Sequence, residues 1–140
     1  MAIKQLSVYA ENNKGSLANI LQVLADAGIN LLTMSIADTN RYGIIRLVAD
    51  DTQKALDVLK TAGLTANVRD VVAVAIPNES GGLAKVLRIL SDNDINLEYA
   101  YSIVVQETGV AYVAMRVDDN DKTETMLKDN GITVLNQGDI

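Results

Sequence analysis

Apolar residues recur at intervals of three and four positions in two segments of this chain, residues 15–31 and 81–97. In the first segment these residues are Leu17, Ile20, Leu21 and Leu24, and in the second they are Leu83, Val86, Leu87 and Leu90. Such spacing places the apolar side chains on one face of an α-helix. We therefore predict an amphipathic helix in each segment, followed in each case by a strand that begins around Ile-Asn-Leu.

The two segments are copies of one sequence. When Gly15–Leu31 is aligned with Gly81–Leu97 at a constant shift of 66 positions, nine of the seventeen residues are identical. An internal repeat of this kind decides how the rest of the chain is interpreted. We predict two units of the same architecture, one over residues 1–69 and one over residues 70–140.

Each unit is predicted to have the order βαββαβ. In the first unit, residues 3–10 alternate between apolar and polar, and residues 30–37, 42–49 and 64–69 are further strand candidates. A second helix begins near Asp50-Asp51-Thr52 and ends at Gly63. This order predicts an α+β fold of two tandem ferredoxin-like units, each an antiparallel sheet with its helices on one face.

Two details follow from the same pattern. Residues 65–76 contain neither glycine nor proline, so we expect the last strand of the first unit to run directly into the first strand of the second. The helix predicted over residues 121–130 has the smallest apolar face, with only Met126 and Leu127 strongly apolar. We expect that helix to be the least stable element.

Composition removes several classes of function. The chain has no cysteine and no histidine, which excludes thiol nucleophiles, imidazole catalysis and the usual zinc sites, and we expect no cofactor, no metal and no enzyme activity. A net charge of −6 disfavours nucleic acid as a partner. No apolar run approaches the ~20 residues that span a membrane, so we expect no membrane partner and a cytoplasmic location. Because a unit of about 70 residues buries little surface, we expect a homodimer.

The turn before each repeated helix is the candidate site. Gly15, Gly81 and Gly82 allow close backbone approach, and a helix start offers free N–H groups that suit a carboxylate. Asparagines lie three residues before these glycines and at the start of the next strand, which we expect beside the turn. The candidate ligand-binding residues are Asn12, Gly15, Ser16 and Asn30 in the first unit and Asn78, Gly81, Gly82 and Asn96 in the second. Asparagines at such positions also commonly cap helices or hydrogen-bond to the backbone of turns. Spacing alone favours ligand binding and this structural role equally.

The repeated motif resembles that of the ACT domain, an amino-acid-sensing module of many enzymes of amino-acid metabolism. The motif is Asn-x-x-Gly-x-Leu-Ala-x-x-Leu-x-x-Leu followed by Ile-Asn-Leu, and the likeness covers both units. It is especially similar to stand-alone tandem ACT proteins. The resemblance implies ligand sites at domain interfaces, formed by the turn after the first strand and the start of the second. The proline that usually precedes the glycine is Lys14 in the first unit and Ser80 in the second.

Two functions follow from these observations. The first is a regulatory protein that binds a small amino acid and transmits its occupancy to amino-acid metabolism. The second is a ligand-free interaction subunit of a biosynthetic enzyme, such as the small regulatory subunit of acetolactate synthase. An acylphosphatase-like activity lacks its arginine in the first turn, which offers only Lys14 and Ser80. An RNA-binding sheet lacks the exposed aromatic pair and the positive charge.

Overall fold

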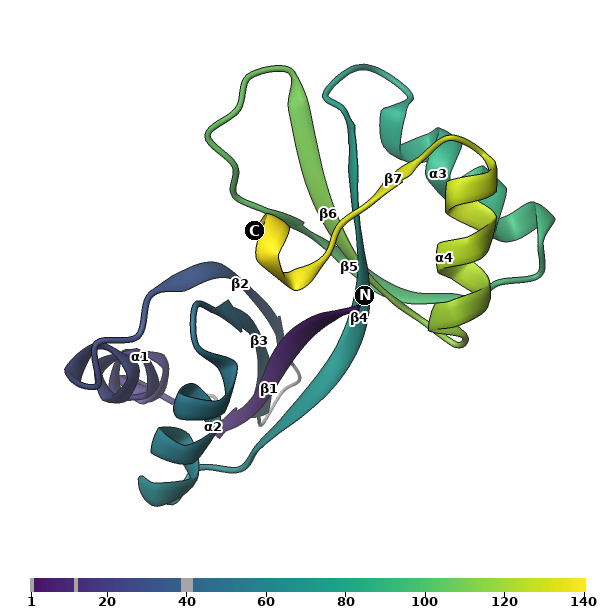
Figure 1. The fold of residues 1–140 in the computed structure, drawn as a ribbon. Coiled ribbons are helices and arrows are strands. Elements are labelled where there is room, and N and C mark those ends of the chain that lie inside the picture. Colours follow the sequence, from purple (N-terminus) through teal and green to yellow (C-terminus); the bar gives the residue numbers. More distant parts are fainter. Residues whose placement is uncertain (1, 12, 39–41) are drawn as a thin grey trace. The chain divides into compact units, whose positions relative to one another are not determined.

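The computed structural model describes residues 2–11, 13–38 and 42–140, and within it the chain divides into two compact units. One unit comprises Lys4–Arg69, and the other contains Asp70–Ile140. Figure 1 labels their elements. The elements of the N-terminal unit are β1 (Ile3–Glu11), α1 (Ser16–Asp26), β2 (Leu31–Asp38), β3 (Tyr42–Ala49), α2 (Thr52–Thr61) and the first part of β4 (Ala66–Pro77).

The C-terminal unit repeats this order. Its elements are the second part of β4, α3 (Gly82–Asp92), β5 (Leu97–Ile103), β6 (Val110–Val117), α4 (Asn120–Asp129), the short strand β7 (Thr133–Val134) and a 3-10 turn, η1 (Gln137–Asp139). The prediction that one strand joins the two units is confirmed, because β4 runs without interruption from Ala66 to Pro77.

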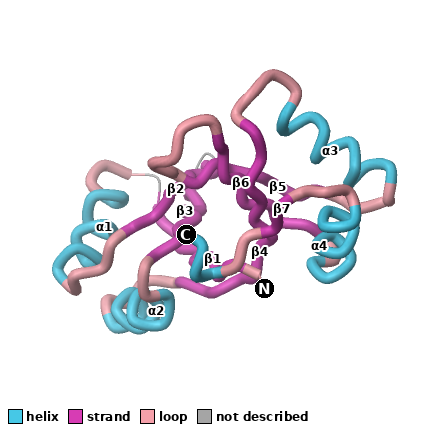
Figure 2. Tube along the Cα trace, turned by 45° about the horizontal axis from the view of Figure 1, so that its top comes forward, coloured by secondary structure: helices cyan, strands magenta, loops and turns pink. Residues whose placement is uncertain are grey.

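Strand pairing is antiparallel in both units. In the N-terminal unit the strand order is β2-β3-β1-β4. Leu47 of β3 lies opposite Leu6 of β1 on one side and opposite Met34 of β2 on the other. In the C-terminal unit β4 lies between β6 and β7, and β5 is the outer strand. Within each unit the two helices lie on the same side of the strands (Figures 1 and 2). The predicted fold of two ferredoxin-like βαββαβ units is therefore confirmed.

Each unit has its own apolar core, made by the helix face that the sequence pattern predicts. In the N-terminal unit, Ile20 and Leu24 of α1 pack with Leu59 of α2 against the β1 residues Leu6 and Val8. The corresponding core residues of the C-terminal unit are Val86, Leu90, Leu127, Val72 and Val74. All of these side chains are buried, so each core holds its helices on one face of its sheet.

The helix predicted over residues 121–130 is observed as α4, Asn120–Asp129. Its one fully buried large apolar side chain is Leu127, and Met126 is only partly buried. Thr123 and Glu124 complete its buried face. The low stability of this helix stays a prediction. Among the described residues, the helices are too short and too polar for any of them to cross a membrane.

Candidate functional site

The repeated helices α1 and α3 begin differently from the other two. Gly15 and Gly81 precede them in the left-handed conformation, with φ of 85° and 82°, and no described side chain caps either helix start. The other two helices are capped by aspartates. The carboxylate of Asp51 accepts a hydrogen bond from the Lys54 N–H at 3.1 Å, and that of Asp119 does so from the Lys122 N–H at 3.0 Å. Only the helices of the repeated motif therefore begin without a side-chain acceptor among the described residues.

Backbone carbonyls satisfy part of the α1 start. The Ser16 N–H donates to the Asn13 carbonyl at 3.2 Å, and the Asn19 N–H donates to the Gly15 carbonyl at 3.0 Å. Within the described chain, no residue accepts a hydrogen bond from the N–H groups of Leu17 or Ala18. These groups point out of the helix start and, with the helix dipole, favour an anionic group. The α1 start is therefore able to accept a carboxylate from outside the chain.

A groove of about 690 Å³ lies beside this helix start in the N-terminal unit. Its walls are the end of β1, the first half of α1, Tyr42 at the start of β3, and residues 62–65 between α2 and β4. Ile20, Val23 and Leu64 give it an apolar surface, and Ser16 and Asn19 add a hydroxyl and an amide. This volume is within the range of natural small-molecule sites.

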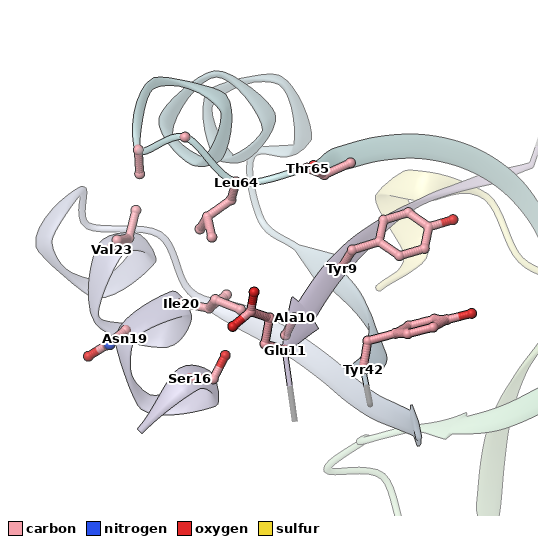
Figure 3. Close-up of a pocket in the computed structure, with 12 residues that line it drawn as sticks. Tyr9, Ala10, Glu11, Ser16, Asn19, Ile20, Val23, Tyr42, Leu64 and Thr65 are labelled. Atoms are coloured by element: carbon pink, nitrogen blue, oxygen red, sulfur yellow. The ribbon is translucent and has the colours of Figure 1, made fainter. Parts of the chain in front are cut away.

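Glu11 carries the only charged side chain among the described residues that line this groove. In Figure 3 its carboxylate extends toward α1, whereas the rings of Tyr9 and Tyr42 extend away from the helices. The Asn13 amide Nδ2 donates a hydrogen bond to Glu11 Oε2 at 3.1 Å. That contact holds the carboxylate at the turn and leaves its other oxygen for a second donor.

A smaller groove of about 160 Å³ adjoins the same turn. Glu11 and Ser16 line both grooves, and Ile36 and Ile45 give the smaller one an apolar wall. The turn from β1 to α1 is thus flanked by concave surface on two sides. Among the described residues, a carboxylate, apolar surface and backbone N–H groups without a described acceptor come together at this turn.

The prediction that Asn30 lies beside the turn at Gly15 is wrong within a single unit. Glu11, at the Gly15 end, pairs with Tyr42, whereas Leu31, which follows Asn30, pairs with Ala49. Tyr42 and Ala49 are at opposite ends of β3, about 24 Å apart at the ~3.4 Å rise of an antiparallel strand. The reason is that α1 runs back along the sheet before β2 begins. The predicted residue Asn12 lies outside the described residues.

The C-terminal unit separates its predicted residues in the same way. Pro77, next to Asn78, pairs with Val110, whereas Leu97, next to Asn96, pairs with Val117 at the other end of β6. Asn96 lines a groove of about 490 Å³ with Ser91 and Asp94, and Asn78 does not line that groove. The Asn78 N–H donates instead to the Gly109 carbonyl at 2.9 Å.

Gly82 has a structural reason for being glycine. A Cβ at this position would lie 2.5 Å from the carbonyl oxygen of Pro77, which is closer than real Cβ contacts come. Ser16 occupies the corresponding place in the N-terminal unit. The close backbone approach at Gly82 is therefore made by the protein's own chain. The role of Gly82 in ligand binding stays a prediction.

Glu11, Asn19, Tyr42 and Leu64 line the groove but were not predicted as site residues. The repeat itself contains the signal for Glu11, since the residue 66 positions further on is Pro77. A position that changes from a carboxylate to a proline between two copies marks a difference in chemistry between them. Among the described residues, no group of three or more acidic side chains is placed to hold a metal ion.

Comparison with known proteins identifies the family. Residues 1–140 match the family model described as an ACT domain pair. The crystal structure of protein BT0572 from Bacteroides thetaiotaomicron is 38% identical, with a TM-score of 0.93 over 99% of this chain and 95% of that one. A comparison with curated proteins found no match.

Two more distant structures share the fold. The ligand-free regulatory subunit of aspartate kinase from Thermus thermophilus is 17% identical, with a TM-score of 0.67 over 92% of this chain and 93% of that one. The regulatory subunit of aspartate kinase from Thermus flavus is 20% identical, with a TM-score of 0.67 over 91% and 90% of the two chains. The family match over the whole length and the two βαββαβ units agree, and the chain belongs to the family of ACT domain pairs.

Proposed function

We propose that this protein is a non-catalytic regulator that binds a free amino acid in the N-terminal groove and transmits its occupancy to an enzyme of amino-acid metabolism. The observation that carries the proposal is the α1 start, which has no side-chain cap among the described residues and opens beside a groove of about 690 Å³. Membership of the ACT family supports it. The fold shared with regulatory subunits of aspartate kinase is consistent with it.

The groove offers a partner for each part of an amino acid. The Ser16 hydroxyl lines the groove and suits a carboxylate. The N–H groups of Leu17 and Ala18, from which no described residue accepts a hydrogen bond, belong to the same helix start, although neither residue lines this groove. The Glu11 carboxylate suits an ammonium group. A ligand of fewer than about ten heavy atoms reaches micromolar affinity only when most of its polar groups are matched in this way.

Regulation requires that the occupied and empty states differ in affinity for the partner enzyme. Coupling of this kind is typically about 1–3 kcal/mol, which changes a partner's affinity by roughly 5- to 150-fold. The β1–α1 turn is suited to this role because a ligand there would hold β1, α1 and residues 62–65 together. Tightening of those elements on binding is the change that we propose the enzyme detects.

Isothermal titration calorimetry against each of the twenty amino acids tests the binding proposal directly. We expect at least one amino acid to bind with a dissociation constant in the micromolar range. Heats indistinguishable from dilution for all twenty, at protein concentrations that would detect millimolar binding, would contradict the proposal. Analytical ultracentrifugation of the same samples would test the homodimer, which remains a prediction.

A second candidate is an interaction subunit that needs no ligand. Met34 and Ile36 on the outer strand β2 are 42% and 47% exposed, although they pair with the core residues Leu47 and Ile45. An outer strand with exposed apolar side chains favours pairing with another chain. Replacing Met34, which lines neither groove at the β1–α1 turn, with Ser would weaken assembly but spare amino-acid binding if docking and sensing are separate functions.

A further inference from the structure

The two units differ in the residues that line the groove. Aligned through the repeat, Pro77 replaces Glu11, Lys85 replaces Asn19, and Ala75 replaces Tyr9. Beyond the two-residue shift in the second half of the unit, Val110 replaces Tyr42. At these positions the C-terminal unit therefore has neither a carboxylate nor an aromatic ring, and it has a cation where the N-terminal unit has an amide.

The C-terminal turn also has less space at the first residue of its helix. Gly82 has the carbonyl of Pro77 where a side chain would be, whereas Ser16 at the matching position lines the N-terminal groove. The Pro77 carbonyl accepts a hydrogen bond from the Glu79 N–H at 2.9 Å, and the Glu11 carbonyl accepts one from the Asn13 N–H at the same distance. The two turns therefore share this bond and differ in the space beside the first helical residue, which is closed at Gly82 and open at Ser16.

Resting on the function proposed above, we propose that the chain binds one amino acid, in the N-terminal unit only. The same groove selects an uncharged apolar side chain and holds the ammonium group through Glu11. Glu11 would hold the ammonium group because it is the only charged side chain lining the groove within the described chain. Its Oε2 already accepts a hydrogen bond from Asn13 Nδ2. A cation that enters this groove meets a carboxylate with one oxygen already hydrogen-bonded to Asn13 and the other available.

The preference for an apolar ligand side chain follows from the other residues that line the groove. Ile20 is 2% exposed and forms part of the core, and Val23, Leu64 and Ala62 surround the space with apolar atoms. A charged ligand side chain placed against these residues would lose its hydration, and no second ionised group among the described residues lines the groove to replace it. An aliphatic or aromatic side chain would instead gain from leaving water.

The experiment uses the full-length wild-type chain and two variants, Glu11→Gln and Glu79→Gln. Glu79 is an exposed acid in the corresponding turn of the C-terminal unit, two residues after the position that matches Glu11, so its variant makes the same change in net charge outside the groove. Each protein is titrated calorimetrically with the twenty amino acids singly. The wild type is also titrated with the deaminated analogue of the tightest-binding amino acid.

We expect one ligand per chain, tightest binding by amino acids with apolar side chains, and little or no binding of the deaminated analogue. Loss of a charge-assisted hydrogen bond in Glu11→Gln should weaken binding by about tenfold or more, and Glu79→Gln should stay within about twofold of the wild type.

The possible failures are distinguishable. If no amino acid binds the wild type, the proposed function fails and this inference fails with it. If an amino acid binds but Glu11→Gln binds it equally well, or if lysine or aspartate binds tightest, the proposed function survives and the ligand class is wrong. Two ligands per chain would overturn the assignment to a single unit.

Discussion

Asn30 and Asp50 exchange two hydrogen bonds at the end of the N-terminal unit where α1 leads into β2. The Asn30 N–H donates to Asp50 Oδ1 at 3.1 Å, and the Asp50 N–H donates to the Asn30 carbonyl at 3.0 Å. The two residues are 20 positions apart, so they join the start of β2 to the end of β3. At this junction the N–H and the carbonyl of Asn30 are both hydrogen-bonded to Asp50.

Replacing Asp50 with Ala should lower the free energy of unfolding by about 1 kcal/mol, because the Asn30 N–H loses its carboxylate acceptor. Asp118 holds the corresponding place in the C-terminal unit, and no described contact joins it to Asn96. Asp118→Ala should therefore change stability by less than half as much. Urea unfolding followed by circular dichroism measures both, and equal losses would show that the Asn30 contact contributes nothing specific.

The two aspartate caps should behave alike. Asp51→Ala and Asp119→Ala each leave a helix start without its acceptor, and each should cost about 1 kcal/mol, within the 0.5–2 kcal/mol usual for such caps. Asp51→Asn and Asp119→Asn keep an acceptor oxygen and should cost only a few tenths. Thermal unfolding at one protein concentration gives the comparison. An Asn variant as damaging as its Ala counterpart would argue that charge, and not the cap, matters there.

Arg116 joins two parts of the C-terminal unit. Its Nε is 3.1 Å from Glu98 Oε2, and its Nη1 donates to the Asp70 carbonyl at 3.2 Å. Glu98 is 52% exposed, so Glu98→Gln should cost less than about 0.5 kcal/mol, and less again in 1 M salt. Arg116→Ala also loses the contact with Asp70 and should cost more. Urea unfolding at low and high salt separates the contribution of the ion pair with Glu98 from that of the hydrogen bond to Asp70. If Glu98→Gln lowered the free energy of unfolding as much as Arg116→Ala, the hydrogen bond to Asp70 would contribute nothing further.

Most of the fold was accessible from the sequence because the repeat doubled each local signal. The spacing of apolar residues in α1 and α3 identified the same core face twice, and the absence of breakers over residues 65–76 predicted the uninterrupted strand β4. At the α1 start the sequence left two possibilities open, a side-chain cap or N–H groups available to a ligand, and no described side chain caps this helix start.

The candidate site was harder to predict, for two physical reasons. Asn30 was placed beside Gly15 because it begins the next strand, but a helix of eleven residues carries the chain to the far end of the sheet first. Glu11 was missed because its importance depends on residues 62–65, which complete the groove only after α2 has packed. Residues that meet through tertiary packing leave little trace in local sequence patterns.

Gly82→Ala should be among the most damaging small substitutions in the C-terminal unit. The added Cβ would lie 2.5 Å from the Pro77 carbonyl oxygen, which belongs to the backbone at the end of β4 and so has little freedom to move. Overpacking of this kind costs about 1–3 kcal/mol. Gly138→Ala is the matched control, because a Cβ there meets no described atom within 4 Å and needs no unusual φ.

The free energy of unfolding, measured in urea for both glycine variants, should fall for Gly82→Ala and stay within about 0.5 kcal/mol of wild type for Gly138→Ala. The same samples report on ligand binding. Because Gly82 is constrained by its own chain, its variant should retain the wild-type affinity of the N-terminal groove while it remains folded. A folded Gly82→Ala protein of normal stability that had lost amino-acid binding would instead place Gly82 in contact with the ligand.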